Sequence, residues 1–199
     1  MSQEFPLIPH QNLNSLKESL NFLHMEELKE ICTKLLLPTQ EKKGALILRI
    51  LHFIEFGKVI KAPKIPDISC ARRGENYPLH PTTCILKGNY KNDLTTRLFF
   101  KKLIGEHFHF TAFGVDWLNN RWIQGKPPTY QEFADMWTNE IKRRKEEGSH
   151  PKEEWAYINF TQKFMRQNPN SQRHELLEAW EKERQRQKEN VTKIMQMFK

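Results

Sequence analysis

Residues 25–54 read MEELKEICTKLLLPTQEKKGALILRILHFI, and this stretch decides the fold class. Its first part carries an apolar stripe at helical spacing, formed by Met25, Leu28, Ile31 and Leu35. Pro38 ends that stripe, because proline disfavours helical geometry in the residue before it. A second stripe restarts near Lys43 and ends at Gly57; it comprises Leu46, Ile47, Ile50, Leu51 and Ile54. The pattern predicts two short helices joined by an extended turn.

The same residues resemble the SAP domain, a helix–loop–helix module that binds DNA. The resemblance spans residues ~13–56 and rests on Leu28, Leu37-Pro38, Lys43, Leu46-Ile47 and Arg49-Ile50. In that family the loop and the start of the second helix face the phosphate backbone. The resemblance therefore implies DNA contacts at Thr39, Lys42, Lys43 and Arg49. One residue departs from the family pattern, since Glu41 stands where a glycine is usual.

A physical argument supports phosphate contacts at Lys42-Lys43. Backbone amides at a helix N-terminus lack partners within the helix and attract anions. The two lysines add positive charge at that end. Such contacts position a protein on a duplex without reading its bases, so we expect weak sequence preference. The alternative is an ordinary solvated lysine pair at the start of an amphipathic helix.

The net charge of +8 favours a polyanionic partner, and its distribution extends the predicted interface. Residues 1–60 are neutral overall, whereas 61–90 carry +3, 91–145 carry +4 and 146–199 carry +1. The excess therefore lies mostly outside the SAP-like module. We expect further phosphate contacts from two basic clusters: Arg72 and Arg73, and Lys142, Arg143, Arg144 and Lys145.

Periodicity and composition predict an all-α chain in four parts. A helical stripe of Leu13, Leu16, Leu20 and Leu23 joins the module to form residues 1–57. Residues 58–90 are a basic linker stiffened by prolines. A central helical domain spans 91–145, and a C-terminal helical hairpin spans 146–199. Because residues 181–190 contain no apolar side chain, the last helix is expected to be solvated there or to leave the globule.

The central domain carries clear helix signals. Asp93 and Thr111 are placed as N-caps, and Thr129 with Glu132 forms a capping box. Aromatic residues interleave with lysines near Phe99-Phe100 and between Trp117 and Trp122. Such residues could stack on single-stranded bases, but at helical spacing they more often form a core.

Residues ~88–142 also resemble an uncharacterised family of bacterial helical domains that often follows a SAP-like module. The resemblance rests on Arg97, Phe99, Phe100, Ile104, Gly105, His107, Phe108, His109, Phe110, Thr111, Gly125, Lys126, Thr129, Tyr130 and Trp137. It implies the order of the domains and a bacterial origin, and it implies no activity.

No catalytic constellation is evident, so we expect neither an enzyme nor a cofactor. The sequence lacks a phosphate-cradling glycine loop, a nucleophile elbow and a His-Glu-x-x-His motif. His107 and His109 alternate along the chain and are the sole candidate metal ligands. Alternation with Phe108 and Phe110 equally describes an edge with aromatics inward and histidines outward, and we expect no metal.

Several features predict a cytosolic location, and the resemblance of residues ~88–142 implies that this cytosol is bacterial, with the nucleoid as the site if DNA is bound. No apolar run is long enough to span a membrane, and the N-terminus lacks the pattern of a signal peptide. The three cysteines, Cys32, Cys70 and Cys84, show no metal-type spacing and suit a reducing compartment.

Two functions from different classes follow. The first is a non-enzymatic protein that binds double-stranded DNA through the SAP-like module. The second is a protein–protein adaptor, favoured by the neutral N-terminal region and by Glu41. In the second, the stripe Leu13–Leu23 and the apolar tail Val191–Phe198 would dock a partner or a second copy of the chain.

Overall fold

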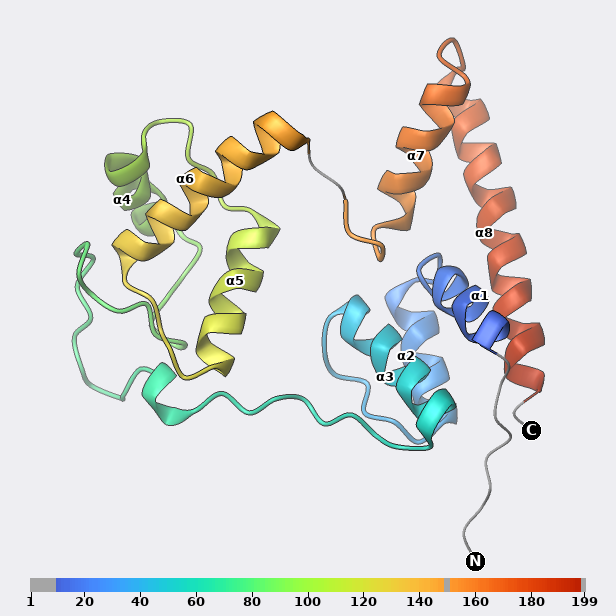
Figure 1. The fold of residues 1–199 in the computed structure, drawn as a ribbon, viewed down its shortest axis with the longest axis horizontal. Coiled ribbons are helices and arrows are strands. Elements are labelled where there is room, and N and C mark those ends of the chain that lie inside the picture. Colours follow the sequence, from blue (N-terminus) through green and yellow to red (C-terminus); the bar gives the residue numbers. More distant parts are fainter. Residues whose placement is uncertain (1–9, 149–150, 198–199) are drawn as a thin grey trace, which may run out of the picture. The chain divides into compact units, whose positions relative to one another are not determined.

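The computed structural model describes residues 10–148 and 151–197, and this part of the chain is all-helical (Figure 1). The helices are α1 His10–Leu20, α2 Met25–Lys34, α3 Lys43–Phe56, α4 Leu94–Ile104, α5 Ala112–Ile123, α6 Tyr130–Glu147, α7 Ala156–Gln167 and α8 Arg173–Gln196, with a 3-10 turn at Asp67–Ser69. The described residues form no strand, which confirms the all-α prediction. Within them, no helix has the length and apolar character needed to cross a membrane.

The chain divides into two compact units. One is formed by residues 1–61 and 150–199, and the other by residues 62–149. In the first unit α1 contacts both α3 and α8, and α8 also pairs with α7 (Figure 1). The core joins the leucine stripe to the C-terminal tail, because Leu16, Leu20, Val191 and Ile194 are all buried in one cluster. The predicted N-terminal module and C-terminal hairpin thus belong to one unit.

This packing buries several side chains of the two predicted docking surfaces within the unit. Leu16 and Leu20 are fully buried, and Val191 and Ile194 are each 4% exposed, because the stripe and the tail cover one another. Phe198, which the sequence assigned to the tail, lies outside the described residues. Met197 of the tail remains 51% exposed, so the burial concerns the side chains that face the core.

The polar stretch of α8 also packs against the N-terminal helices. Asn190 donates from Nδ2 to the hydroxyls of Ser15 and Ser19 at 2.9 and 2.8 Å. Ser19 is 1% exposed and donates to Gln187 Oε1 at 2.5 Å. The prediction that residues 181–190 are solvated or leave the globule is therefore wrong for this face, since hydrogen bonds replace apolar contacts there.

Glu27 of α2 forms ion pairs with two cations of α8, and its carboxylate also caps the start of its own helix. Its carboxylate lies 2.7 Å from Arg184 Nη2 and 2.8 Å from Lys188 Nζ. The backbone N–H of His24 donates to Glu27 Oε2 at 2.7 Å. Partial burial raises the pKa of Glu27, but the hydrogen bonds from Lys188, His24 and Arg184 outweigh it and lower that pKa to about 2.

We expect Glu27 to make the free energy of unfolding of this unit depend on pH in the acid range. A carboxyl whose folded pKa is depressed stabilises above its unfolded pKa, and the stabilisation is lost as pH falls from about 4.5 to about 2. The loss is about 2 kcal/mol in the free energy of unfolding. Urea unfolding of the wild type and Glu27→Gln across this range measures it. Glu26→Gln is the matched control, since Glu26 is exposed and pairs only with Lys29 at 3.4 Å among the described contacts.

The second unit packs α4, α5 and α6 around an aromatic core. Phe100 is fully buried, and Phe108, Trp122, Phe133 and Trp137 are each at most 8% exposed. Burial of these rings leaves them unable to stack on nucleic-acid bases, so the core interpretation of this region is confirmed for Phe100 and Trp122.

The predicted caps of these helices are confirmed. The Asp93 carboxylate accepts from Thr96 N at 2.8 Å, and Thr111 Oγ1 accepts from Gly114 N at 3.3 Å. Both halves of the capping box are present: Thr129 N donates to Glu132 Oε2 at 2.7 Å, and Glu132 N donates to Thr129 Oγ1 at 3.1 Å. Side-chain oxygens here satisfy amides that no helical carbonyl can reach.

The proline-rich stretch before α4 differs from the linker that the sequence predicts. Ile85 is fully buried in the aromatic core, and its carbonyl accepts from Trp122 Nε1 at 2.7 Å. Its backbone N–H donates to Pro128 O at 2.6 Å. Extended, proline-punctuated backbone leaves N–H and C=O groups available for such pairing, so residues 62–90 belong to the second unit.

Candidate nucleic-acid interface

The loop between α2 and α3 begins with an unusual helix end. Leu37 N donates to Cys32 O at 2.8 Å, and Leu36 N donates to Thr33 O at 3.1 Å. This pair of bonds is the Schellman motif, which needs a left-handed residue at Leu36. Leu36 takes a φ of 55° and is 92% exposed, although glycine is the usual residue there. The loop therefore starts from a strained leucine that contributes almost no burial.

Arg49 holds the loop from inside. The residue is only 4% exposed, and its Nη1 donates to Pro38 O at 2.6 Å and to Gln40 O at 3.0 Å. Its Nε reaches Ile60 O at 3.4 Å. The sequence placed Arg49 among the DNA contacts, but its donors are used on backbone carbonyls of its own unit. We therefore leave it out of the interface.

Lys43 is also engaged within the unit. Its Nζ donates to the backbone carbonyl of Asn21 at 2.6 Å. Burial lowers the pKa of Lys43, and the carboxylate of Glu154 acts in the opposite direction. The side chain ties the start of α3 to the end of α1, so its ammonium is not displayed at the surface as the sequence predicted.

Lys42 and Thr39 are the two other residues of this loop that the sequence assigned to DNA contact. Lys42 is exposed and is the N-cap of α3, where its carbonyl accepts from Ala45 N at 3.0 Å and Leu46 N at 3.1 Å. Thr39 is half-buried. The geometry of a helix start leaves the first amides of α3 without carbonyl partners in the helix. Of the residues that the sequence assigned to the DNA site on this loop, Lys42 is exposed and Thr39 is half-buried.

Glu41 occupies a backbone conformation that suits glycine. Its φ is 117°, in the region that L-residues adopt only with strain, and its side chain is exposed. The glycine that the SAP pattern has at this position would remove that strain. It would also remove a negative charge beside Lys42.

We expect Glu41→Gly to stabilise the protein by about 1 kcal/mol, because relief of the strained φ exceeds the added entropy of the unfolded chain. Glu41→Gln is the control, since it removes the charge and keeps the strain, and it should leave stability nearly unchanged. Urea unfolding compares the three proteins. Equal stabilities of the glycine and glutamine variants would mean that the backbone at position 41 is not strained.

The Arg72-Arg73 cluster lies on an exposed turn of the second unit. Both side chains are exposed, and Arg72 Nη1 lies 3.5 Å from Glu75 Oε1. An ion pair of this length at the surface is weak. Both guanidinium groups therefore lie at the surface of the second unit.

Half of the Lys142–Lys145 cluster is neutralised by α6 itself. Arg143 pairs with Glu140 at 2.8 Å and Glu147 at 2.9 Å, and Arg144 pairs with Glu140 at 2.7 Å. The guanidinium of Arg144 also lies 4.3 Å from the centroid of the Phe113 ring. Hydrogen bonds from Arg143 and then Arg144 lower the pKa of Glu140 to about 2. Lys142 and Lys145 are exposed and remain the stronger candidates.

His107 and His109 lie beside the Trp137 ring, each with 5.7 Å between ring centroids. Both histidines are exposed, and His109 Nδ1 is 3.2 Å from His107 O. Within residues 10–148 and 151–197, no three His, Cys, Asp or Glu side chains are grouped as a metal site. Phe108, which lies between the two histidines in the sequence, is buried, as the alternative with the aromatics inward predicted.

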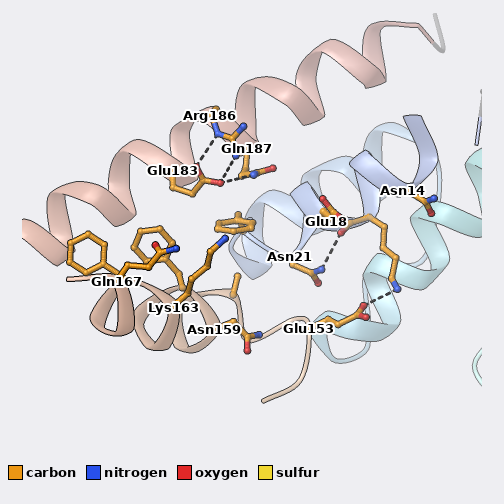
Figure 2. A pocket seen from close by; sticks show the side chains of 15 residues that line it. Asn14, Glu18, Asn21, Glu153, Asn159, Lys163, Gln167, Glu183, Arg186 and Gln187 are labelled. Atoms are coloured by element: carbon orange, nitrogen blue, oxygen red, sulfur yellow. Dashed lines mark hydrogen bonds and ion pairs between the residues drawn. The ribbon is translucent and has the colours of Figure 1, made fainter. Parts of the chain in front are cut away.

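A separate groove of about 820 Å³ lies between α1, α7 and α8 (Figure 2). Its apolar lining comes from Phe22, Phe160, Phe164 and Ala156. Its charges balance: the cations are Lys17, Lys163 and Arg186, and the anions are Glu18, Glu153 and Glu183. Lys17 pairs with Glu153 at 2.8 Å and Arg186 with Glu183 at 2.6 Å, and Figure 2 shows Lys163 reaching into the space between α7 and α8. Sequence reasoning missed this groove because its walls come from opposite ends of the chain.

The chain matches no protein-family model, no curated protein and no solved structure.

Proposed function

We propose that this protein binds DNA without catalysing a reaction, through the surface formed by Thr39, Lys42 and the first amides of α3. The observation that carries the proposal is Lys42, an exposed cation at the N-cap of a helix whose start follows an extended loop. A helix N-terminus and an adjacent ammonium together favour a phosphate group. The resemblance of the loop and its flanking helices to the SAP domain supports the same function.

Charge supports a polyanionic partner for the whole chain. The unit of residues 1–61 and 150–199 has 18 Lys and Arg against 14 Asp and Glu, and the unit of residues 62–149 has 14 against 10. Each unit thus carries an excess of +4. Salt-sensitive affinity scales with the number of phosphates neutralised, so exposed Arg72, Arg73, Lys142 and Lys145 would add affinity without sequence preference.

The test is binding of the full chain to a labelled random-sequence duplex at several salt concentrations. Lys42→Ala should weaken binding several-fold and reduce the slope of log affinity against log salt by about one. Lys58→Ala is the matched control, because Lys58 is exposed just beyond the other end of α3. If wild type and both variants bind equally, the surface around Lys42 is not the DNA site. A strong preference among unrelated duplexes would contradict backbone recognition.

The groove between α1, α7 and α8 supports a second candidate, a protein–protein adaptor. Its apolar floor and balanced lining charges suit a protein segment better than a polyanion. Trp155, Tyr157 and Ile158 near the start of α7 add exposed apolar surface, at 39%, 43% and 45% exposure. If the chain binds no duplex at low salt, this second function is the one to pursue.

A further inference from the structure

One face of α4 lies at the surface of the second unit. The helix packs against α6, and its inner face carries the buried side chains of Thr96 and Phe100. On the outer face Leu94 is 66% exposed and Leu98 is 51% exposed. These two leucines are four positions apart, so they lie one above the other along the helix. They form a short apolar stripe that faces solvent.

Cations flank this stripe on both sides. Since an α-helix has 3.6 residues per turn, Arg97 and Lys101 lie on one side of the two leucines and Lys102 lies on the other. Arg97 and Lys102 are exposed, and Lys101 is half-buried. The sequence of α4 contains no acidic residue. The outer face of this helix therefore has an apolar centre and charges of a single sign at its edges.

Contacts within the unit orient two of these cations. The guanidinium carbon of Arg97 lies 5.4 Å from the centroid of the Phe110 ring. Lys101 Nζ lies 2.8 Å from Glu106 Oε2, just beyond the end of α4. The Glu106 side chain is 88% exposed, so this ion pair is weak and another carboxylate competes with it for the ammonium. Cations held in place suit a partner whose carboxylates also have fixed positions, because less entropy is lost on binding.

We propose that this face of α4, formed by Leu94, Leu98, Arg97, Lys101 and Lys102, docks an acidic amphipathic helix of a partner protein. Apolar side chains of the partner pack on the leucines, and its carboxylates meet the flanking cations, as in helix pairs whose flanking charges select the partner. A phosphate backbone would satisfy the cations but would leave the leucines without apolar contact. The inference is independent of DNA binding, since it concerns a surface of the other unit.

The probe is a labelled synthetic helix of about 15 residues, with leucine at every third or fourth position and glutamate at the flanking positions. Its binding to the full chain is measured by fluorescence anisotropy. We expect Leu94→Ser/Leu98→Ser to weaken binding on the order of tenfold, and Lys102→Gln to weaken it about threefold. Leu48→Ser and Lys126→Gln are the matched controls, since Leu48 of α3 is 60% exposed and Lys126 is exposed in the second unit. Each control should change the affinity less than about twofold.

Four results would overturn the proposal. The first is the absence of peptide binding, or equal binding by the wild type and Leu94→Ser/Leu98→Ser. The second is equally tight binding of a peptide with lysine in place of glutamate. The third is self-association of the wild type that the double variant loses, which would make a second copy of the chain the occupant. The fourth is co-sedimentation with phosphatidylserine-containing vesicles that the double variant loses while the peptide does not bind, which would make a membrane surface the occupant.

Discussion

Ile194→Asp is expected to unfold the unit formed by residues 1–61 and 150–199. Ile194 is 4% exposed and belongs to the same buried cluster as Leu16 and Leu20. The variant loses the burial of an isoleucine, about 2 kcal/mol, and places a carboxylate in an apolar core. The combined cost is about 5 kcal/mol or more, which is comparable to the whole stability of a small domain.

Hydrogen exchange by mass spectrometry distinguishes local from global loss. Amides of α1, α2 and α3 should lose protection in Ile194→Asp, whereas those of α4 to α6 should keep it, since they belong to the other compact unit. Met197→Asp is the matched control, because Met197 is 51% exposed near the same helix end. Retained protection of α1 in Ile194→Asp would mean that the C-terminal tail does not complete this core.

The sequence predicts the helices of this protein better than their partners. Caps such as Asp93 and the Thr129–Glu132 box depend on residues three positions apart, so the local pattern is sufficient to find them. The pairing of α1 with α8 joins residues more than 160 positions apart, and no local signal specifies it.

The polar seam between α1 and α8 left a signal that periodicity could have revealed. Trp180, Arg184, Gln187, Val191 and Ile194 recur at helical spacing, and α1 carries Ser15 and Ser19 at i and i+4. A search for helical periodicity among apolar residues alone misses such a face, because it treats polar residues as solvent-exposed. Their burial becomes evident only when the donors on α8 meet the hydroxyls on α1.

The candidate site was predictable in position but not in every residue. The proline at 38 and the lysine pair locate the loop and the start of α3. Whether a cation there faces solvent or a backbone carbonyl depends on the path of the loop. Lys43 donates to Asn21 O and Arg49 donates to Pro38 O. Both acceptors are backbone carbonyls, and a sequence motif does not record the direction in which a backbone carbonyl points. Glu154 approaches Gly44 of α3 from a segment that carries no motif.

Arg49→Met is expected to destabilise the same unit by about 3 kcal/mol. The apolar part of the side chain is replaced, but the carbonyls of Pro38, Gln40 and Ile60 lose their charged donor. Hydrogen bonds to a charged group contribute about 1.5–3 kcal/mol each, and a buried carbonyl without a partner adds its desolvation cost. Urea unfolding monitored by hydrogen exchange of α2 and α3 measures the change.

Arg49→Lys is the control that separates charge from geometry. Lysine keeps the positive charge but presents one ammonium in place of the guanidinium fork, so it should recover only part of the stability. If Arg49 instead contacted DNA, Arg49→Met would weaken duplex binding and leave the unfolding transition unchanged. Because the side chain is 4% exposed, we expect the opposite: the unfolding transition of Arg49→Met shifts strongly.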